Sequence, residues 1–217
     1  MNISALKQQA ERHGWSRAVG DVALGAVNRA VLLKVLKGVK IHEPNPAFLK
    51  CDPKYAGRFL DAATLRAFAT RPEFELDAAF VEAALAKGDE CYALVCGDDL
   101  AAYGWYSNKP TEIEVSGLEV HFDPSYMYMY KGFTHARHRG QRLHAIGMTR
   151  ALQAYLARGY RGLVSYVEWN NFDSLRSCYR MGYDNFGDVY VTRLLGRYLV
   201  WTDAGCRTTG FTLAHAG

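Results

Sequence analysis

The stretch that decides the fold runs from residue 126 to 183 and reads YMYMYKGFTHARHRGQRLHAIGMTRALQAYLARGYRGLVSYVEWNNFDSLRSCYRMGY. Its pattern predicts a strand over 126–133, a glycine-containing turn, a helix over 141–158 and a second strand over 162–168, followed by a short helix. Two strands joined by a helix are expected to lie parallel in one sheet, with a right-handed crossover. The order of elements therefore predicts an α/β fold around a central pair of parallel strands.

The turn between the first strand and the first helix is strongly basic. Residues 134–142 read THARHRGQR and include three arginines, two histidines and one glycine. Backbone N–H groups at the start of a helix, together with positive charge, bind anions such as phosphate. Open α/β sheets bind ligands at the carboxyl ends of their parallel strands, where this turn is expected. The turn therefore predicts a site for a phosphorylated ligand.

The second, shorter helix carries distinct signals at both ends. Asn171 is a favoured N-cap residue, and Gly182 is a favoured residue just past a helix end. The helix therefore begins with N-x-x-S, in which Ser174 is the fourth letter, and closes with Gly182-Tyr183.

These motifs, in this order, resemble those of the GNAT superfamily of acyl-CoA-dependent N-acyltransferases. In that family a Q/R-x-x-G-x-G/A turn wraps the pyrophosphate of CoA, and the next helix begins N-x-x-S/A and closes with Gly-Phe. Arg137 and Gly140 match the turn, whereas Arg142 replaces the family's small residue. The resemblance covers residues 88–202. It implies a GNAT-like mixed, mostly antiparallel sheet, splayed at its central parallel pair, with helices on both faces.

By resemblance, the chain uses acetyl-CoA, or another acyl-CoA, as its co-substrate and needs no metal ion. Asn171 and Ser174 are expected near the pantetheine arm and the adenosine side of CoA. The expected cofactor-binding residues come from the first strand, the turn and the two helix starts: Phe133, Thr134, Arg137, His138, Arg139, Gly140, Gln141, Arg142, Leu143, Asn171 and Ser174.

The implied reaction is N-acyl transfer, with acetyl as the first choice, from acyl-CoA to a primary amine of a small molecule. The amine attacks the thioester directly, a backbone N–H binds the oxyanion, and the leaving thiolate takes up a proton. The family places the N–H donor on its central strand, here near Lys131 to Phe133. Gly132 is expected to mark a β-bulge there.

The proton donor departs from the family pattern. The family's Tyr stands four residues before the closing glycine, where this chain has Cys178, and Tyr179 follows it. One residue turns a side chain by about 100° around a helix, so Tyr179 does not simply inherit the role. Tyr179 stays a candidate proton donor, and the alternative is that it is an aromatic residue of the core. Cys178 could donate a proton weakly or, on a less favoured route, carry the acyl group. Water or the departing ammonium is the favoured alternative source of the proton.

The candidate general bases lie next to the central strands. Glu168, at the end of the second strand, is one candidate, and Glu119 and His121, before the first strand, are others. His135 lies within the basic turn and is expected to contact phosphate or solvent.

Six aromatic residues fall in the strands that precede the turn. Alternate members share a face, so one face is expected to fill the core of the sheet and the other to line an acceptor pocket. They are Tyr103, Trp105, Tyr106, Tyr126, Tyr128 and Tyr130.

The rest of the chain is predicted to add helices and antiparallel strands. Residues 1–80 are expected to form an N-terminal helical extension packed on the same domain, and residues 81–217 the acyl-CoA-binding core. Helices are expected at 3–13, 19–37, 54–70 and 77–87, with an edge strand near 39–42. A hairpin is expected over 90–107, with further strands over 112–120, 183–194 and 197–202.

The composition is that of a folded protein of moderate charge. The 217 residues carry a net charge of +4, and 49% of them are hydrophobic, which argues against disorder and supports nucleic-acid binding only weakly. The five cysteines show no framework, and no apolar run has the length of a membrane span. We therefore expect a cytoplasmic protein whose partner is the small-molecule amine, with neither nucleic acid nor membrane; a homodimer stays open.

Two other classes of function stay open as well. A non-catalytic acyl-CoA-binding or regulatory module is favoured by Arg142 and Cys178, which stand where the family has other residues. A nucleic-acid- or membrane-associated protein would use the basic amphipathic helix expected over 19–37. Turnover with a panel of amines separates the first alternative from the enzyme, and salt-dependent binding that requires residues 1–40 would support the second.

Overall fold

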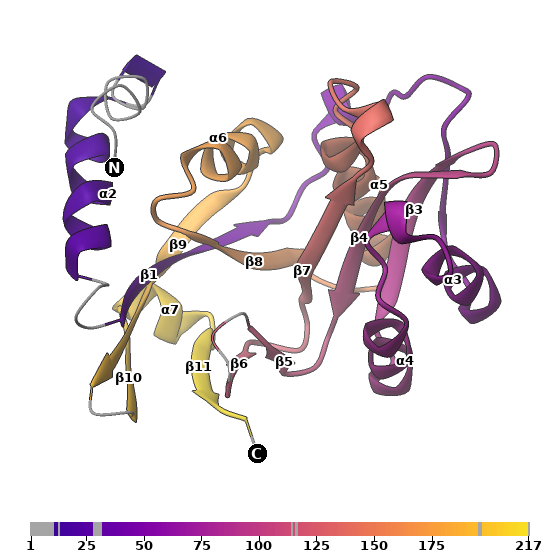
Figure 1. Ribbon diagram of the computed structural model, residues 1–217. Helices are drawn as coiled ribbons and strands as arrows, with labels where there is room; N and C mark the ends of the chain where they lie inside the picture. Colours follow the sequence, from indigo (N-terminus) through magenta and orange to yellow (C-terminus); the bar gives the residue numbers. More distant parts are fainter. Residues whose placement is uncertain are drawn as a thin grey trace.

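A large β-sheet forms the centre of the molecule (Figure 1). The computed structural model describes residues 11–12, 14–27, 32–113, 115, 117–194 and 197–216. The large sheet is eight-stranded, with the order β10-β9-β1-β8-β7-β4-β3-β2. A small three-stranded sheet has the order β11-β6-β5.

Neighbouring strands of the large sheet are antiparallel, except for β7 and β8, which run parallel. The strands of this sheet are β1 (Leu32–Ile41), β2 (Ala56–Phe59), β3 (Glu90–Cys96), β4 (Asp99–Ser107), β7 (Met127–Thr134), β8 (Leu163–Glu168), β9 (Asp184–Leu194) and β10 (Arg197–Thr202). The small sheet consists of β5 (Thr111–Glu112), β6 (Leu118–His121) and β11 (Thr212–His215). The predicted mixed, mostly antiparallel sheet with a central parallel pair is therefore confirmed.

Helices cover both faces of this sheet. The described helices are α2 (Trp15–Val27), α3 (Ala62–Ala69), α4 (Ala78–Lys87), α5 (Leu143–Ala157), α6 (Phe172–Met181) and α7 (Ala204–Thr208), with the short 3-10 helices η1 (Pro46–Phe48), η2 (Pro72–Phe74) and η3 (Ala136–His138). α5 and α6 share a core with Met127 and Met129 of β7. The small sheet and α7 pack against Tyr126 and Tyr128, and α3 and α4 pack on β3 and β4. Successive residues of a strand point to opposite faces of the sheet. Met127 and Met129 therefore face α5 and α6, whereas Tyr126 and Tyr128 face the small sheet and α7.

Several local signals in the sequence place elements correctly. The predicted hairpin is present as β3 and β4. The Asn171 side chain accepts a backbone N–H group and caps α6, as predicted, and the Asp77 side chain caps α4 in the same way. Gly88 and Gly182 then end these helices in the left-handed conformation that glycine tolerates.

Residues 32–41 form a central strand, so the helix predicted over 19–37 is wrong in its second half. α2 ends at Val27, and β1 pairs with β8 on one side and with β9 on the other. Leu36, Val39 and Ile41 are all buried. A strand that is covered on both faces has apolar residues without strict alternation, and this spacing also fits a helix. The edge strand predicted near 39–42 is the end of this central strand.

The lysines that gave the predicted helix its charge lie in β1. Lys34 pairs with Glu168, and Lys37 Nζ lies 2.8 Å from Asp188 Oδ2. The basic helix on which a nucleic-acid- or membrane-associated function would depend is therefore not formed. None of the described helices combines the length and the apolar character needed to cross a membrane.

Two further predictions change in detail. Residues 54–70 hold β2 and α3 rather than one helix, because Asp61 accepts the N–H of Thr64 and starts α3 there. Residues 112–120 hold the end of β5 and most of β6, two short strands rather than one. α7 and β11, which were not predicted, follow the last predicted strand. The first predicted helix falls mostly outside the described residues, and the division of the chain at residue 80 stays a prediction.

The two parallel strands separate soon after they start. Only two residue pairs join them, beginning where Met127 meets Leu163. One step further, the Ser165 hydroxyl donates to the Met129 carbonyl oxygen at 2.7 Å. β7 is buried as far as Met129, whereas residues 130–134 are partly or fully exposed. The strands are therefore splayed as predicted, and the end of β7 forms one wall of an opening.

We predict that Ser165→Ala lowers the free energy of unfolding by about 1 kcal/mol, because it removes the hydroxyl that bridges β8 to the Met129 carbonyl. Ser125→Ala is the matched control. The Ser125 hydroxyl joins no two strands and lies near the Asp123 carboxylate of its own turn, so its removal changes stability less than loss of the Ser165 bridge does. Chemical denaturation of the three proteins measures both effects, and equal stability of Ser165→Ala and wild type would contradict the role of this bridge.

Candidate functional site

β7 points backbone N–H groups into the opening where β8 diverges. The N–H of His135, just past β7, donates to the Ala101 carbonyl oxygen of β4 at 3.0 Å. The N–H groups of a strand alternate in direction, so those of Thr134 and Gly132 point away from β4 and toward the opening. Gly132 is exposed and Thr134 is partly buried, so these donors are accessible to solvent or to a ligand. A ligand that lies between β7 and β8 would provide acceptors for them.

A β-bulge interrupts the pairing of β7 with β4 at this level. Lys131 and Met129 pair with consecutive residues of β4, so Tyr130 between them is the extra residue. The bulge predicted at Gly132 therefore lies two residues earlier. The Tyr130 hydroxyl donates to the Asp89 carboxylate at 2.7 Å. Burial, together with this carboxylate, raises the pKa of Tyr130, so the hydroxyl stays protonated and holds the bulge in place.

Gly132 has no room for a side chain because of a neighbour on α5. A Cβ atom at this position would lie 2.4 Å from Cε1 of His144. Burial lowers the pKa of His144, so an uncharged imidazole lies beside the open edge of β7 at neutral pH. His144 was not among the residues selected from the sequence. It precedes Met148 by four residues, which places it on the apolar face of α5 and is the signal that could have found it.

The basic turn enters α5 through two left-handed residues, Gly140 with φ +80° and Arg142 with φ +57°. Arg142 is the N-cap residue of α5, and its side chain makes no capping hydrogen bond. The first N–H groups of α5 therefore lack a capping side chain, and such a helix start binds anions. The left-handed backbone also gives a physical reason why the resembled family has a small residue at this position.

Asp99 ties the turn to the hairpin of β3 and β4. His138 Nε2 lies 3.6 Å from the Asp99 carboxylate, and its Nδ1 is 3.2 Å from the Tyr55 hydroxyl. Arg137 and Arg71 approach the same carboxylate at 3.6 and 3.4 Å. Burial alone would raise the pKa of Asp99, but the neighbouring Arg137, His138 and Arg71 side chains lower it. The His138 side chain thus anchors the turn, while that of Arg137 is 63% exposed and accessible to an anion.

The other turn residues divide between solvent and core. The side chains of Arg139, Gln141 and Arg142 are exposed. Leu143 is only 1% exposed, so its backbone is the part that can reach a ligand. His135, which was expected to contact phosphate or solvent, is buried, and its Nδ1 accepts a backbone N–H of the turn at 3.2 Å.

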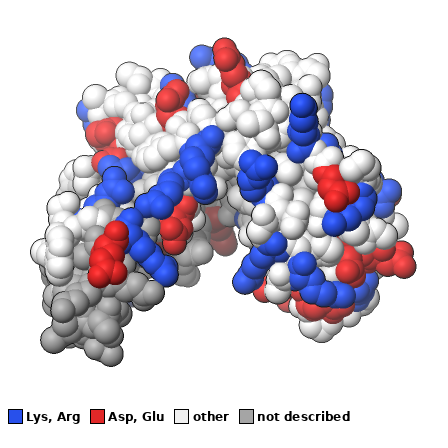
Figure 2. All heavy atoms as spheres, turned by 90° about the horizontal axis from the view of Figure 1, so that it is seen from above, with Lys and Arg blue, Asp and Glu red and all other residues white. Residues whose placement is uncertain are grey.

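The start of α6 lies beside the start of α5, at the carboxyl end of the neighbouring parallel strand. Asn171 is exposed, and its side-chain oxygen accepts the N–H of Ser174 at 3.2 Å. The NH2 group of Asn171 is therefore the part that can donate to a ligand. Figure 2 shows this end of the molecule, with Lys and Arg side chains on both sides of a hollow between two lobes. Figure 2 also shows Asp and Glu side chains beside and within the hollow, so its charge is mixed.

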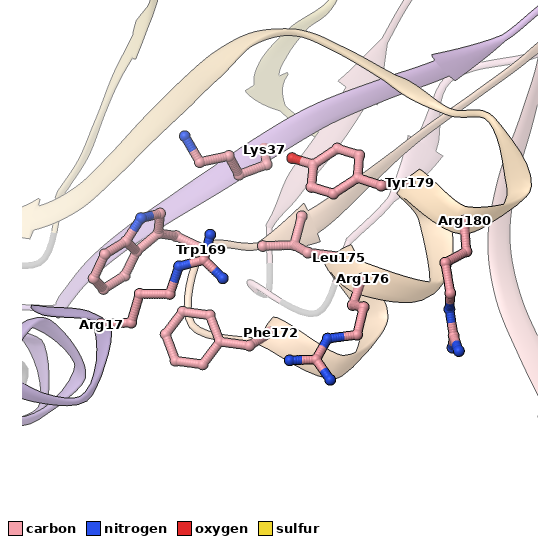
Figure 3. A pocket seen from close by; sticks show the side chains of 8 residues that line it. All are labelled: Arg17, Lys37, Trp169, Phe172, Leu175, Arg176, Tyr179 and Arg180. Carbon is pink, nitrogen blue, oxygen red and sulfur yellow. The ribbon is translucent and has the colours of Figure 1, made fainter. Parts of the chain in front are cut away.

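The three candidate catalytic side chains have different surroundings. Glu168, at the end of β8, forms an ion pair with Lys34. Cys178 is 9% exposed, and burial raises the pKa of its thiol to about 11, so the thiol is protonated at neutral pH. Tyr179 is 48% exposed and lines a cavity between α2 and α6 (Figure 3). It follows Ser174 by five residues, so the two side chains point about 140° apart around the helix.

Glu119 and His121 are brought together on β6, where His121 Nε2 lies 2.8 Å from Glu119 Oε1. Their neighbours Leu118 and Val120 are buried against the large sheet. Because side chains alternate along a strand, the Glu119–His121 pair faces away from the large sheet. These two alternative bases therefore do not lie on the face of β6 that meets the large sheet.

Five of the six strand aromatics fill the core. Tyr103, Trp105, Tyr106, Tyr126 and Tyr128 are each at most 5% exposed. Tyr130 is the partly exposed one. The interpretation as core filling is confirmed for these five, and the acceptor-wall interpretation is wrong for them. The ring of Phe133 stacks on one of them, Tyr103, with 5.2 Å between centroids.

The fold is that of the GNAT acetyltransferases, although no protein-family model and no curated protein matches the sequence. A tandem GNAT protein from the clavulanic acid biosynthesis pathway aligns with TM-score 0.51 and 18% identity, over 91% of this chain and 59% of its own. A GCN5-related N-acetyltransferase-like protein from Streptococcus suis aligns with TM-score 0.50 and 13% identity, over 83% and 67%. For a GCN5-related N-acetyltransferase from Sphaerobacter thermophilus the values are 0.50 and 12%, over 78% and 52%. The chain thus spans about half to two thirds of the length of these proteins.

We predict that Arg142→Gly raises the free energy of unfolding, because it relieves a left-handed backbone that costs about 1 kcal/mol for a residue with a Cβ atom. Part of this gain is offset by the greater freedom of glycine in the unfolded chain. Glu75→Gly, at the other described non-glycine residue with positive φ (+51°), has the same effect. Gln141→Gly, where φ is not positive, lowers stability instead. Thermal unfolding measures the stability of all three variants. An equal loss of stability in Arg142→Gly and Gln141→Gly would contradict the strain at Arg142.

Proposed function

We propose that this chain, which has the GNAT N-acetyltransferase fold, is an acyl-CoA-dependent N-acyltransferase. It would move an acyl group, with acetyl as the first choice, to a primary amine of a small molecule. The observation that supports this proposal most is the opening between β7 and β8. One wall presents N–H groups of β7, and an uncapped helix start with exposed arginines lies at its mouth. The sequence motifs that resemble the family fall on these same elements.

The basic turn is proposed to hold the diphosphate of CoA. Three exposed arginines, Arg137, Arg139 and Arg142, surround the start of α5. Their guanidinium groups make strong, charge-assisted hydrogen bonds with phosphate oxygens. The left-handed conformation at Gly140 and Arg142 turns the chain so that the first N–H groups of α5 face the same anion.

The open edge of β7 is proposed to hold the pantetheine arm. Carbonyl oxygens of that arm would accept from the N–H group of Thr134 and from the NH2 group of Asn171. The exposure of β7 after Met129 leaves room for this contact. An extended arm beside β7 would complete the hydrogen bonding that β8 leaves unmade.

Bound acyl-CoA supplies the thioester that the amine attacks. The Gly132 N–H is proposed to donate to the negative charge that develops on the thioester oxygen, since it points into the opening and is fixed by the bulge. The neutral imidazole of His144 lies next to this residue. Burial lowers the pKa of His144, so the ring is unprotonated at neutral pH and has a nitrogen that can take a proton from an attacking ammonium, although the same shift makes it a weaker base. We propose His144 for this role in preference to Glu168, which is paired with Lys34.

Direct attack is favoured over a covalent route through Cys178. A thiol must lose its proton to become a nucleophile, and burial raises the pKa of Cys178 to about 11. At pH 7 such a thiol is almost wholly protonated. Its burial among the side chains between α6 and the sheet also limits access to an acyl group.

A non-catalytic acyl-CoA-binding module is the second candidate function. It is favoured by the buried Cys178, which occupies the position of the proton-donating Tyr in the resembled family. Binding of CoA without turnover of any amine would identify this function.

We predict that CoA raises the melting temperature of the wild-type protein, because a ligand that binds only the folded state stabilises it. Arg137→Ala weakens CoA binding by about tenfold to a hundredfold, the usual loss for a hydrogen bond to a charged group. Arg66→Ala is the matched control, because Arg66 lies on α3 and pairs with Glu82 at 2.6 Å. Thermal shift and calorimetry measure both. A wild-type protein that shows no response to CoA or acetyl-CoA would refute the proposed function.

We predict that Cys178→Ala keeps turnover of acetyl-CoA with a responsive amine within about threefold of wild type, since the protonated thiol takes no part in the transfer. His144→Gln lowers kcat by about a hundredfold or more and removes the rise of rate through the His144 pKa, as loss of a general base does. Thiolate release followed by a chromogenic disulfide measures the rates. An inactive but folded Cys178→Ala protein would instead support an acyl-cysteine route.

A further inference from the structure

A small cavity lies between α5 and the strands β3 and β4, and His144 is one of the residues that line it. Tyr106 and Gly104 of β4 and Gly147 of α5 line it as well. The cavity leaves about 10 Å³ for the centre of a water molecule, which is space for about one water. We name it the α5–β4 cavity.

Two paired glycines bring a hydroxyl and an imidazole to neighbouring places over the sheet. Gly104 of β4 lies directly opposite Gly132 of β7, and the Cβ positions of such a pair are about 4.5–5.5 Å apart on the same face. A Cβ atom at Gly104 would be 2.9 Å from the Tyr106 hydroxyl oxygen, and one at Gly132 would be 3.0 Å from Nδ1 of His144. One water molecule bridges polar groups that are about 5–6 Å apart. The spacing of the pair therefore suits such a bridge.

The Tyr106 hydroxyl is a buried donor without a partner. Tyr106 is 0% exposed, and its hydroxyl oxygen has no hydrogen-bond partner among the described residues. The ring of Tyr155 packs against that of Tyr106, with 5.3 Å between centroids, and so fixes the direction of the hydroxyl. Burial raises the pKa of Tyr106, so the hydroxyl keeps its proton. A buried polar group of this kind is usually paired with a bound water molecule.

His144 needs a hydrogen-bond partner for a different reason. A neutral imidazole has one N–H donor and one bare nitrogen, and the hydrogen bond made by one nitrogen decides which of the two carries the proton. Burial keeps this imidazole neutral, because it lowers the pKa of His144. The proposed proton transfer requires a bare nitrogen, so the partner of the other nitrogen matters for the reaction.

We infer that the α5–β4 cavity binds one water molecule, through which Tyr106 acts as a positioning residue for His144. The water accepts a hydrogen bond from the Tyr106 hydroxyl and another from one ring N–H of His144. The imidazole is thereby held in one tautomer, whose second nitrogen is bare and takes the proton that the attacking ammonium releases. The role in catalysis rests on the proposed function of His144, whereas the water site does not.

The ring nitrogen signals of His144 in NMR of the full chain test the water bridge, with His144→Gln to assign them. Wild type is expected to give separate signals for one protonated and one bare nitrogen. Tyr106→Phe removes the hydroxyl, and Gly147→Ala puts a methyl group into the cavity, where the nearest listed atom, Leu94 Cδ1, is 4.0 Å away. In both variants the tautomers mix and the two signals move toward each other. Tyr183→Phe is the matched control and leaves them unchanged, because the Tyr183 hydroxyl is also buried without a described partner but does not line the cavity.

Turnover with a responsive amine tests the positioning role separately. Tyr106→Phe is expected to lower kcat by about tenfold, roughly the effect of one hydrogen bond, and to leave KM unchanged. Unchanged His144 signals in both variants, or an equal change in Tyr183→Phe, would overturn the water site. An unchanged kcat of Tyr106→Phe would overturn its positioning role. Full activity of His144→Gln, with signals that respond as expected in the other variants, would refute the proposed role of His144 and leave the water site standing. Melting temperatures show that the variants are folded.

Discussion

The early separation of β7 from β8 is the constraint on which the rest of the site depends. Two residue pairs join these parallel strands, and the N–H groups that β7 then turns toward the opening have no β8 partner. β8 stays paired with β1 from Leu36 to Ile41 along its other edge while it leaves β7. The Ser165–Met129 hydrogen bond closes the paired end. Backbone donors left in this way attract a ligand with acceptors along its length, and the position of the opening follows from sheet pairing alone.

Charge and backbone strain meet at the mouth of this opening. Arg142 adopts a left-handed conformation, which a glycine would adopt at a lower free-energy cost. The same residue adds a positive charge at the start of α5 and leaves the first N–H groups of that helix without a capping side chain. Asp99 holds the turn in place through His138 without neutralising it, because the Arg137 side chain stays largely exposed. The strain is thus located at the residue where the sequence departs from the family that it resembles.

Local signals predicted α5 and α6 because a cap, a stop glycine or a periodic face lies within each element, whereas the splay of the parallel pair was implied by the family resemblance. β1 was misread because a strand covered on both faces has no strict alternation, and its spacing also fits a helix. The bulge at Tyr130 and the contact of His144 with Gly132 depend on the register of β7 against β4 and α5, which no single segment encodes. The cavity between α2 and α6 brings together Arg17 and Tyr179, which are far apart in sequence, so only the folded chain shows it.

The most direct test of the central claim is the response of individual backbone amides to CoA, followed by NMR of the labelled protein. If CoA lies between β7 and β8, the amide signals of Gly132, Thr134 and the first turn of α5 shift on addition of CoA, because their N–H groups gain acceptors. The signals of α2 stay unchanged. Shifts confined to other regions, with those of Gly132 and Thr134 unmoved at saturating CoA, would contradict the claim that the splayed pair is the CoA site.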